Sequence, residues 1–204
     1  MNEPFNSLFQ ERNKVVHIFG TPGTYKTAFL VQIIMQKLQE GTNQIYLVDV
    51  GGSFPYLKFG PIKNLLSNLI VFQPKSLQEE LITFDDLELN KVSRDTIILI
   101  DDVFRRVNPD LKEDNHTESY ILALIASISR IVDFPIFITN EGRAYDNNIH
   151  PYREALTKYY FDEHLLFEKI PRQEKIRIKN RSDDFYTLFT ELRIGKSGSI
   201  SNLF

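Results

Sequence analysis

The chain contains no cysteine among its 204 residues. This absence excludes disulfides, thiol catalysis and cysteine–metal sites, and it is typical of intracellular proteins. No apolar run is long enough to span a bilayer, and residues 1–14 are polar, without the apolar core of a signal peptide. We therefore expect a cytoplasmic protein with no membrane partner.

An excess of positive charge is also missing. The net charge is −3 and the isoelectric point is about 5.8, so the chain as a whole does not attract nucleic acid, and any such binding must come from a local basic patch. The hydrophobic content of 42% is ordinary for a globular protein. The length suits one α/β domain, residues 1–204, with a substantial core.

Apolar runs that are typical of buried strands alternate with helical patterns along the chain. Strands are expected at Val15–Phe19, Gln44–Asp49, Leu69–Phe72, Thr96–Ile100 and Pro135–Thr139, and helices at Thr27–Glu40, Ser76–Leu87 and Thr117–Val132. Glu154–Phe167 reads as helical or mixed. The period changes to two after Pro171, which predicts a β-hairpin within residues 169–204. The pattern indicates an α/β fold: a mainly parallel twisted sheet flanked by helices, closed by an antiparallel hairpin.

Between the first strand and the first helix lies a sequence that is typical of a phosphate-binding P-loop. The pattern G-x-x-x-x-G-K-[ST] requires glycine where this chain has tyrosine. The loop supplies backbone N–H groups and a helix N-terminus to an anion, while its lysine reaches the β- and γ-phosphates and its last hydroxyl binds Mg²⁺. The predicted ATP-binding residues are Gly20, Thr21, Pro22, Gly23, Thr24, Tyr25, Lys26 and Thr27.

A P-loop needs a partner for its metal ion. Asp101 ends an apolar strand, as a Walker B aspartate does, and we expect it to hold Mg²⁺ together with Thr27. The alternative is that Asp101 merely caps the next element.

With these pieces, the chain resembles the ATPase core of the RecA/RadA recombinase family, closest in kind to its short archaeal paralogues of the RadB type. The resemblance runs from Val15 to Ile200. Its pieces are the P-loop, the second strand, the Walker B strand, the helix Ser119–Val132, the segment ending in Thr139-Asn140 and the terminal hairpin. It implies a RecA-like P-loop NTPase core, ATP and Mg²⁺ as cofactors, a recombinase or another RecA-like paralogue as partner, and a role in homologous recombination and DNA repair. Residues 1–14 leave no room for the family's N-terminal DNA-binding domain, so we expect no filament from this chain alone.

The chain departs from the family at positions tied to turnover. The family's second strand is followed by a glutamate that activates the hydrolytic water, and Gly51 stands there instead. Loss of a general base costs about 10²–10⁴-fold in rate, which predicts an ATPase that is weak at most. Asp102 is the candidate substitute. Glu141 stands where the family has a glutamine that senses the γ-phosphate, or is simply an exposed loop residue.

The family implies DNA-facing loops after the Walker B strand and after the Thr-Asn strand. Arg105 and Arg106 open the first loop, and the second, Gly142–Tyr152, holds Arg143 and Tyr145. The alternative is that both are ordinary exposed loops. The densest basic run, Lys169–Arg181, is predicted to place three side chains on one face of a strand, Lys175, Arg177 and Lys179. They would contact single-stranded DNA or a neighbouring subunit's nucleotide, or protect a solvated edge strand.

The sequence is compatible with three functions. The first is an ATP-binding recombinase paralogue that acts as an accessory or regulatory factor. The second is an active P-loop ATPase of another process. The third is a structural partner subunit whose nucleotide site is vestigial. The retained lysine and threonine and the altered residues around them favour the first.

Overall fold

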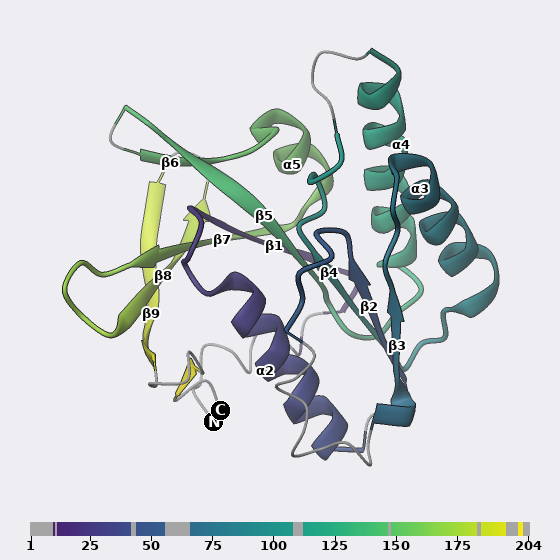
Figure 1. Ribbon diagram of the computed structural model, residues 1–204, viewed down its shortest axis with the longest axis horizontal. Coiled ribbons are helices and arrows are strands. Elements are labelled where there is room, and N and C mark those ends of the chain that lie inside the picture. The colour runs from purple at the N-terminus through teal and green to yellow at the C-terminus, as the bar shows by residue number, and fades with distance from the viewer. Residues whose placement is uncertain are drawn as a thin grey trace.

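A single mixed sheet forms the centre of the computed structural model (Figure 1). The structure describes residues 10, 12–41, 44–55, 66–107, 112–146, 148–182, 185–194 and 200–201. The sheet has the strand order β10-β9-β8-β7-β1-β5-β4-β2-β3, and β6 pairs with β5. The pairings from β7 through β3 are parallel, while β7 to β10 pair in antiparallel fashion. The strands are β1 Val15–Gly20, β2 Gln44–Asp49, β3 Leu69–Phe72, β4 Thr96–Asp101, β5 Ile136–Tyr145, β6 Asn148–Pro151, β7 Glu163–Lys169, β8 Lys175–Ser182, β9 Phe185–Ile194 and β10 Ile200–Ser201.

Helices cover both faces of this sheet, which is why its central strands are apolar on both sides. They are α2 Lys26–Gln39, α3 Leu77–Asp86 with a π-helical extension Leu87–Lys91, α4 Lys112–Ile128 and α5 Glu154–Tyr160. Helix α2 packs on one face, and α3, α4 and α5 pack on the other (Figure 1). Ser76 caps α3 by accepting a hydrogen bond from the Glu79 amide at 3.2 Å, as the capping-box pattern predicts.

The core beneath α2 joins the first half of the chain to the last. The apolar face of the helix is buried, and its Phe29 ring lies 5.3 Å from Phe167 of β7 and 6.2 Å from Phe137 of β5. Ile176 and Ile178 of β8 complete the same cluster. The P-loop helix is therefore seated on strands from the C-terminal part of the chain.

Most of the predicted elements are confirmed, and three differ. Glu154–Phe167 divides into helix α5 and the interior strand β7, which lies between β1 and β8. Helix α4 begins at Lys112 rather than Thr117. Gly142–Tyr152 is not a plain loop, because β5 runs on to Tyr145 and pairs with β6. In addition, β8 is an interior strand, so the interpretation of its lysines as protectors of a solvated edge is wrong.

A buried histidine pair links β1 to β7. Nδ1 of His17 lies 3.1 Å from Nδ1 of His164, and the fully buried His17 ring also stacks on Phe19 at 5.4 Å. Burial, together with the charges of His164 and Arg181, lowers the pKa of His17 well below its usual value. Burial also lowers the pKa of His164 to about 4, helped by the charges of Arg181 and Lys158. Both rings are thus held neutral in the folded protein.

This pair predicts an acid-sensitive fold. The histidines take up protons near pH 6.5 when unfolded but resist doing so when folded, so their contribution to stability is full above pH 6.5 and is lost as pH falls toward about 4. The free energy of unfolding in urea should therefore decrease over this range. The slope should be shallower in the His17→Gln/His164→Gln variant, compared at each pH with wild type. An equal slope in both proteins would show that other groups control the acid response.

Candidate nucleotide-binding site

The carboxyl ends of four neighbouring parallel strands bring the predicted site residues together. The register pairs Gly20 with Glu141 between β1 and β5, and Asp49 with Asp101 between β2 and β4. Ligands of open α/β sheets bind at this edge. Residues that are far apart in the sequence therefore surround one location beside the N-terminus of α2 (Figure 1).

The P-loop backbone has the shape that its sequence pattern requires, although tyrosine replaces one glycine. Gly23 has φ +78°, and Tyr25 has φ +66° and ψ +21°, a left-handed conformation at the N-cap of α2. This conformation costs a residue with a Cβ about 1–2 kcal/mol. The Tyr25 ring packs against the apolar cluster beneath α2, which offsets part of that cost. A Cβ at Gly20 would lie 2.3 Å from the carbonyl oxygen of Phe167, so no larger residue fits there.

Lys26 folds back over the loop in this structure. Its Nζ donates hydrogen bonds to the carbonyl oxygens of Gly20, at 2.8 Å, and Thr21, at 3.2 Å. Burial lowers the pKa of Lys26, and the charges of Asp102, Asp101 and Glu141 oppose that shift. The ammonium group is therefore a partly desolvated cation, held next to the loop where a triphosphate would lie.

Thr27, Asp101 and Thr139 form the link between the loop and the sheet. The Thr27 hydroxyl lies 3.1 Å from both carboxylate oxygens of Asp101, and the Thr139 hydroxyl donates to Asp101 Oδ1 at 2.6 Å. Burial raises the pKa of Asp101 to about 6, although the hydrogen bonds from Thr139 and Thr27 oppose it. A buried carboxylate with so high a pKa is stabilised by a cation.

These residues fit a nucleotide and its metal ion. The loop borders a cavity of about 550 Å³ whose lining includes Gly23, Lys26, Thr27, Ser53 and Lys169. The first turn of α2 carries no acidic residue that would repel an anion. Thr27 and Asp101 would hold Mg²⁺. Among the described residues no cluster of three or more His, Asp or Glu side chains forms a metal cage.

The structure also places three residues whose part in the site the sequence left unassigned. The sequence marks Thr139 only as part of the Thr-Asn pair, yet its hydroxyl donates to Asp101. Asp49 is fully buried, and its Oδ2 accepts a hydrogen bond from Gln73 Nε2 at 2.8 Å. Lys169 lines the cavity from the end of β7. Asp49 and Thr139 are polar residues at the carboxyl ends of predicted strands, which is a signal for a site, but Lys169 carries no such signal because the sequence pattern does not predict β7.

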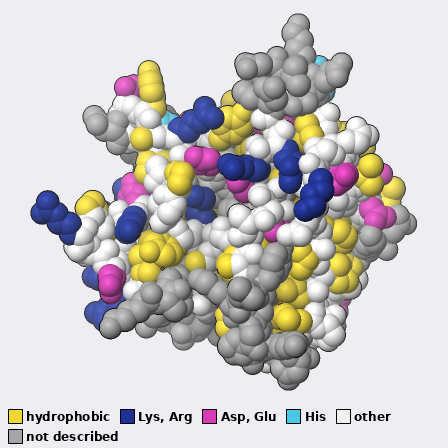
Figure 2. Space-filling model, viewed as in Figure 1, with side chains coloured by type: hydrophobic (Ala, Val, Ile, Leu, Met, Phe, Trp, Pro, Cys, Tyr) yellow, Lys and Arg dark blue, Asp and Glu magenta, His cyan; other side chains and the backbone are white. Residues whose placement is uncertain are grey.

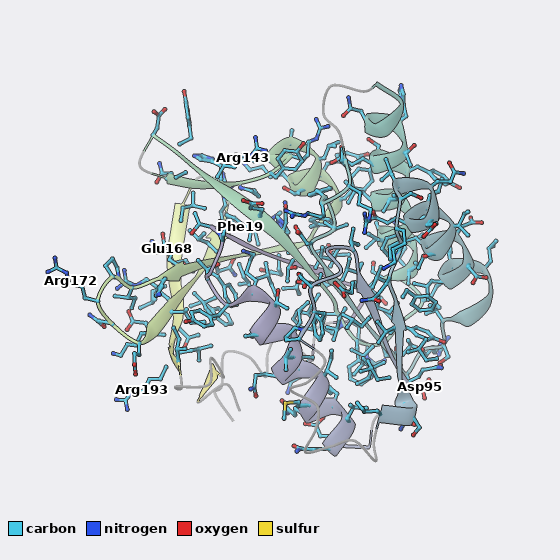
Figure 3. All side chains as sticks on the ribbon, in the orientation of Figure 1. Phe19, Asp95, Arg143, Glu168, Arg172 and Arg193 are labelled. Atoms are coloured by element: carbon cyan, nitrogen blue, oxygen red, sulfur yellow. The ribbon has the colours of Figure 1, made fainter. Side chains whose placement is uncertain are left out.

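The DNA-contact candidates lie in different environments. Tyr145 is 70% exposed at the tip of the β5–β6 hairpin, and the Arg143 guanidinium lies 4.7 Å from the centre of the Tyr152 ring (Figure 3). Arg105 is exposed, with its Nε 3.9 Å from Asp102 Oδ2. Arg106 is half-buried and donates to the Lys75 carbonyl oxygen at 3.1 Å. The side chains thus offered to solvent are Arg105, Arg143 and Tyr145.

Glu154 connects the β5–β6 hairpin to the rest of the molecule through hydrogen bonds and ion pairs. His150 Nδ1 of β6 lies 2.9 Å from the Glu154 carboxylate, which also pairs with Arg181 of β8 and with Lys158. Partial burial acts to raise the pKa of Glu154, but hydrogen bonds from His150 and Arg181 outweigh it and lower the pKa to about 2. The carboxylate therefore stays charged and holds β6, α5 and β8 in one arrangement.

The basic run of β8 lies alongside acidic partners. Arg177 and Lys175 approach Glu191 of β9 at 3.1 and 3.9 Å, and Lys179 pairs with Glu168 of β7 at 2.8 Å. The three side chains do share the predicted face, but carboxylates from both neighbouring strands partly neutralise them. Figure 2 likewise shows basic and acidic side chains interspersed across the upper middle of the face in view. Beyond β7, Arg172 projects away from the body of the protein (Figure 3).

Comparisons with known proteins agree with this architecture. No protein-family model matches the chain. It is 24% identical over 182 residues to the DNA repair and recombination protein RadB of Methanococcus maripaludis, covering 83% of this chain and 82% of that protein. It is 25% identical over 143 residues to RadB of Methanosphaera stadtmanae, covering 64% and 60%. The crystal structure of the RadB recombinase superposes with a TM-score of 0.71 at 17% identity, covering 96% and 95% of the two chains.

The chain is similar in sequence to RadB proteins and shares the fold of the RadB recombinase. The expected RecA-like fold is confirmed, with a mostly parallel sheet between layers of helices. No helix in the described ranges has the length and apolar character to cross a bilayer.

The raised pKa of Asp101 predicts that this residue reduces the stability of the nucleotide-free protein. Its folded-state pKa of about 6 lies above the usual 3.8, so stability declines as pH rises from about 4 to 6 and stays reduced above that. Asp101→Asn should therefore increase the free energy of unfolding at pH 7.5 by about 1–3 kcal/mol. The gain should disappear near pH 4. A less stable variant at pH 7.5 would contradict this assignment.

Proposed function

We propose that this chain binds ATP with Mg²⁺ and acts as an accessory factor in homologous recombination and DNA repair. Its partner would be a recombinase or another RecA-like protein. The RadB relatives are named as DNA repair and recombination proteins, which supports the process. The site described above supports the cofactor.

The observation that carries the proposal is the position of Thr27 between the P-loop and Asp101. Its hydroxyl lies 3.1 Å from both carboxylate oxygens, so the two residues that would share a metal ion already lie together. Lys26 lies beside them, and burial lowers the pKa of its ammonium group. A vestigial site would not need these contacts, which is why we favour nucleotide binding over a purely structural subunit.

ATP binding can be measured directly by isothermal titration calorimetry with Mg²⁺. Wild type should bind, and Lys26→Ala should lose most of the affinity because the triphosphate loses its buried cation. Tyr25→Gly is the matched control within the loop, since glycine adopts the backbone conformation of residue 25 without strain, and it should bind at least as tightly as wild type. Absence of heat at millimolar nucleotide with wild type would reject the proposal.

We further propose that any contact with single-stranded DNA uses the β5–β6 hairpin rather than β8. Tyr145 offers an exposed ring for base stacking, and Arg143 and Arg105 offer charges near the same end of the sheet. The β8 side chains lie next to Glu191 and Glu168, so a phosphate backbone would have to compete with those carboxylates.

Fluorescence anisotropy with a labelled single strand at low salt tests this choice. Arg143→Ala/Tyr145→Ala should weaken binding by about tenfold or more, since one stacked base contributes about 1–3 kcal/mol. The comparison variant Lys175→Gln/Arg177→Gln/Lys179→Gln should change affinity much less. A larger loss of affinity in the β8 variant than in the hairpin variant would assign DNA contact to β8. No binding by wild type at low salt would exclude direct DNA contact.

A further inference from the structure

Gly51, which stands after β2 in place of the family's glutamate, leaves a space beside the carboxylate of Asp102. A Cβ built on Gly51 would lie 3.7 Å from both Cβ and Oδ2 of Asp102, and 3.5 Å from Ser53 Oγ. These are ordinary van der Waals distances, so a side chain at residue 51 would fit. Asp102 therefore places its carboxylate next to the root of the side chain that Gly51 lacks.

Asp102 is held firmly in this position. It has φ +65°, an uncommon conformation for a residue with a Cβ. Its amide donates to the Thr139 hydroxyl at 2.8 Å, and the same hydroxyl donates to Asp101. One threonine thus fixes the relation between the residue that would bind metal and the carboxylate that follows it.

The Asp102 carboxylate lies near enough to Lys26 of the P-loop for its charge to act on that side chain. It borders a cleft of about 200 Å³ together with Asn140, Glu141 and Arg105. About a third of the side chain remains accessible to solvent. Water can therefore reach the carboxylate.

We propose that Asp102 is the catalytic base of a slow ATPase, taking over the part that Gly51 cannot play. Asp102 accepts a proton from a water molecule as the water oxygen bonds to the γ-phosphorus. The bond between the γ-phosphorus and the bridging oxygen breaks, and ADP leaves with its electron pair. The products are ADP and phosphate, and the proton passes from Asp102 to solvent. This step rests on the proposed binding of ATP and Mg²⁺.

Moving the carboxylate from position 102 to position 51 tests whether Asp102 is the catalytic base. Wild type should hydrolyse ATP slowly, and Asp102→Asn or Asp102→Ser should lower kcat by about 10²–10⁴-fold with little change in the affinity for ATP. The double variant Gly51→Glu/Asp102→Ser, which restores a carboxylate from the other strand, should regain at least about tenfold over Asp102→Ser. Asp85→Asn on the exposed face of α3 removes the same charge elsewhere and should match wild type.

Ligand affinities of the variants distinguish a loss of catalysis from a loss of folding. Calorimetric affinity for ADP with aluminium fluoride, which imitates the transferring phosphoryl group, should fall in Asp102→Asn while affinity for ATP is kept. Unchanged turnover in Asp102→Asn, no turnover by wild type, or failure of the double variant to exceed Asp102→Ser would overturn the assignment. If wild type binds no ATP, the proposed function itself fails, and calorimetry shows this before any rate is measured.

Discussion

The hydrogen bonds that join Thr27, Asp101 and Thr139 are the constraint on which the rest of the site depends. They connect the first turn of α2 to the ends of β4 and β5, three elements that are distant in the sequence. The buried carboxylate at their centre carries a pKa raised to about 6, so the folded chain holds an anion that a cation would stabilise. Under the proposed binding of Mg²⁺, the same burial would favour the ion and lower the stability of the nucleotide-free protein.

The loop around this centre shows how a P-loop accommodates an unfavourable residue. Tyr25 adopts the left-handed conformation that glycine would adopt without strain, and its ring packs on the core rather than on the phosphate side. The same core includes Phe167 of β7, whose backbone lies so near Gly20 that only glycine fits there. The C-terminal strands therefore help to determine the shape of the nucleotide loop.

Much of this arrangement could be predicted from the sequence, because it depends on local patterns. The P-loop, the strand that ends at Asp101 and the β8–β9 hairpin each have a periodicity or motif of their own. Strand β7 was harder to recognise, since Glu163–Lys169 carries few alternating residues and directly follows a helix. The ion pairs of Lys175, Arg177 and Lys179 could not be predicted, because their partners come from other strands whose register the sequence does not specify. The proximity of Asp102 to Gly51 likewise depends on the pairing of β2 with β4.

By the proposed mechanism, this chain retains a working ATP site in which Asp102 replaces the missing base. A crystal structure with Mg²⁺ and a non-hydrolysable ATP analogue tests it most directly. We expect Lys26 on the terminal phosphates, Mg²⁺ between Thr27 and the triphosphate near Asp101, and a water bound to Asp102 in line with the γ-phosphate. A nucleotide that binds elsewhere, or an Asp102 carboxylate turned away from the γ-phosphate, would contradict the account.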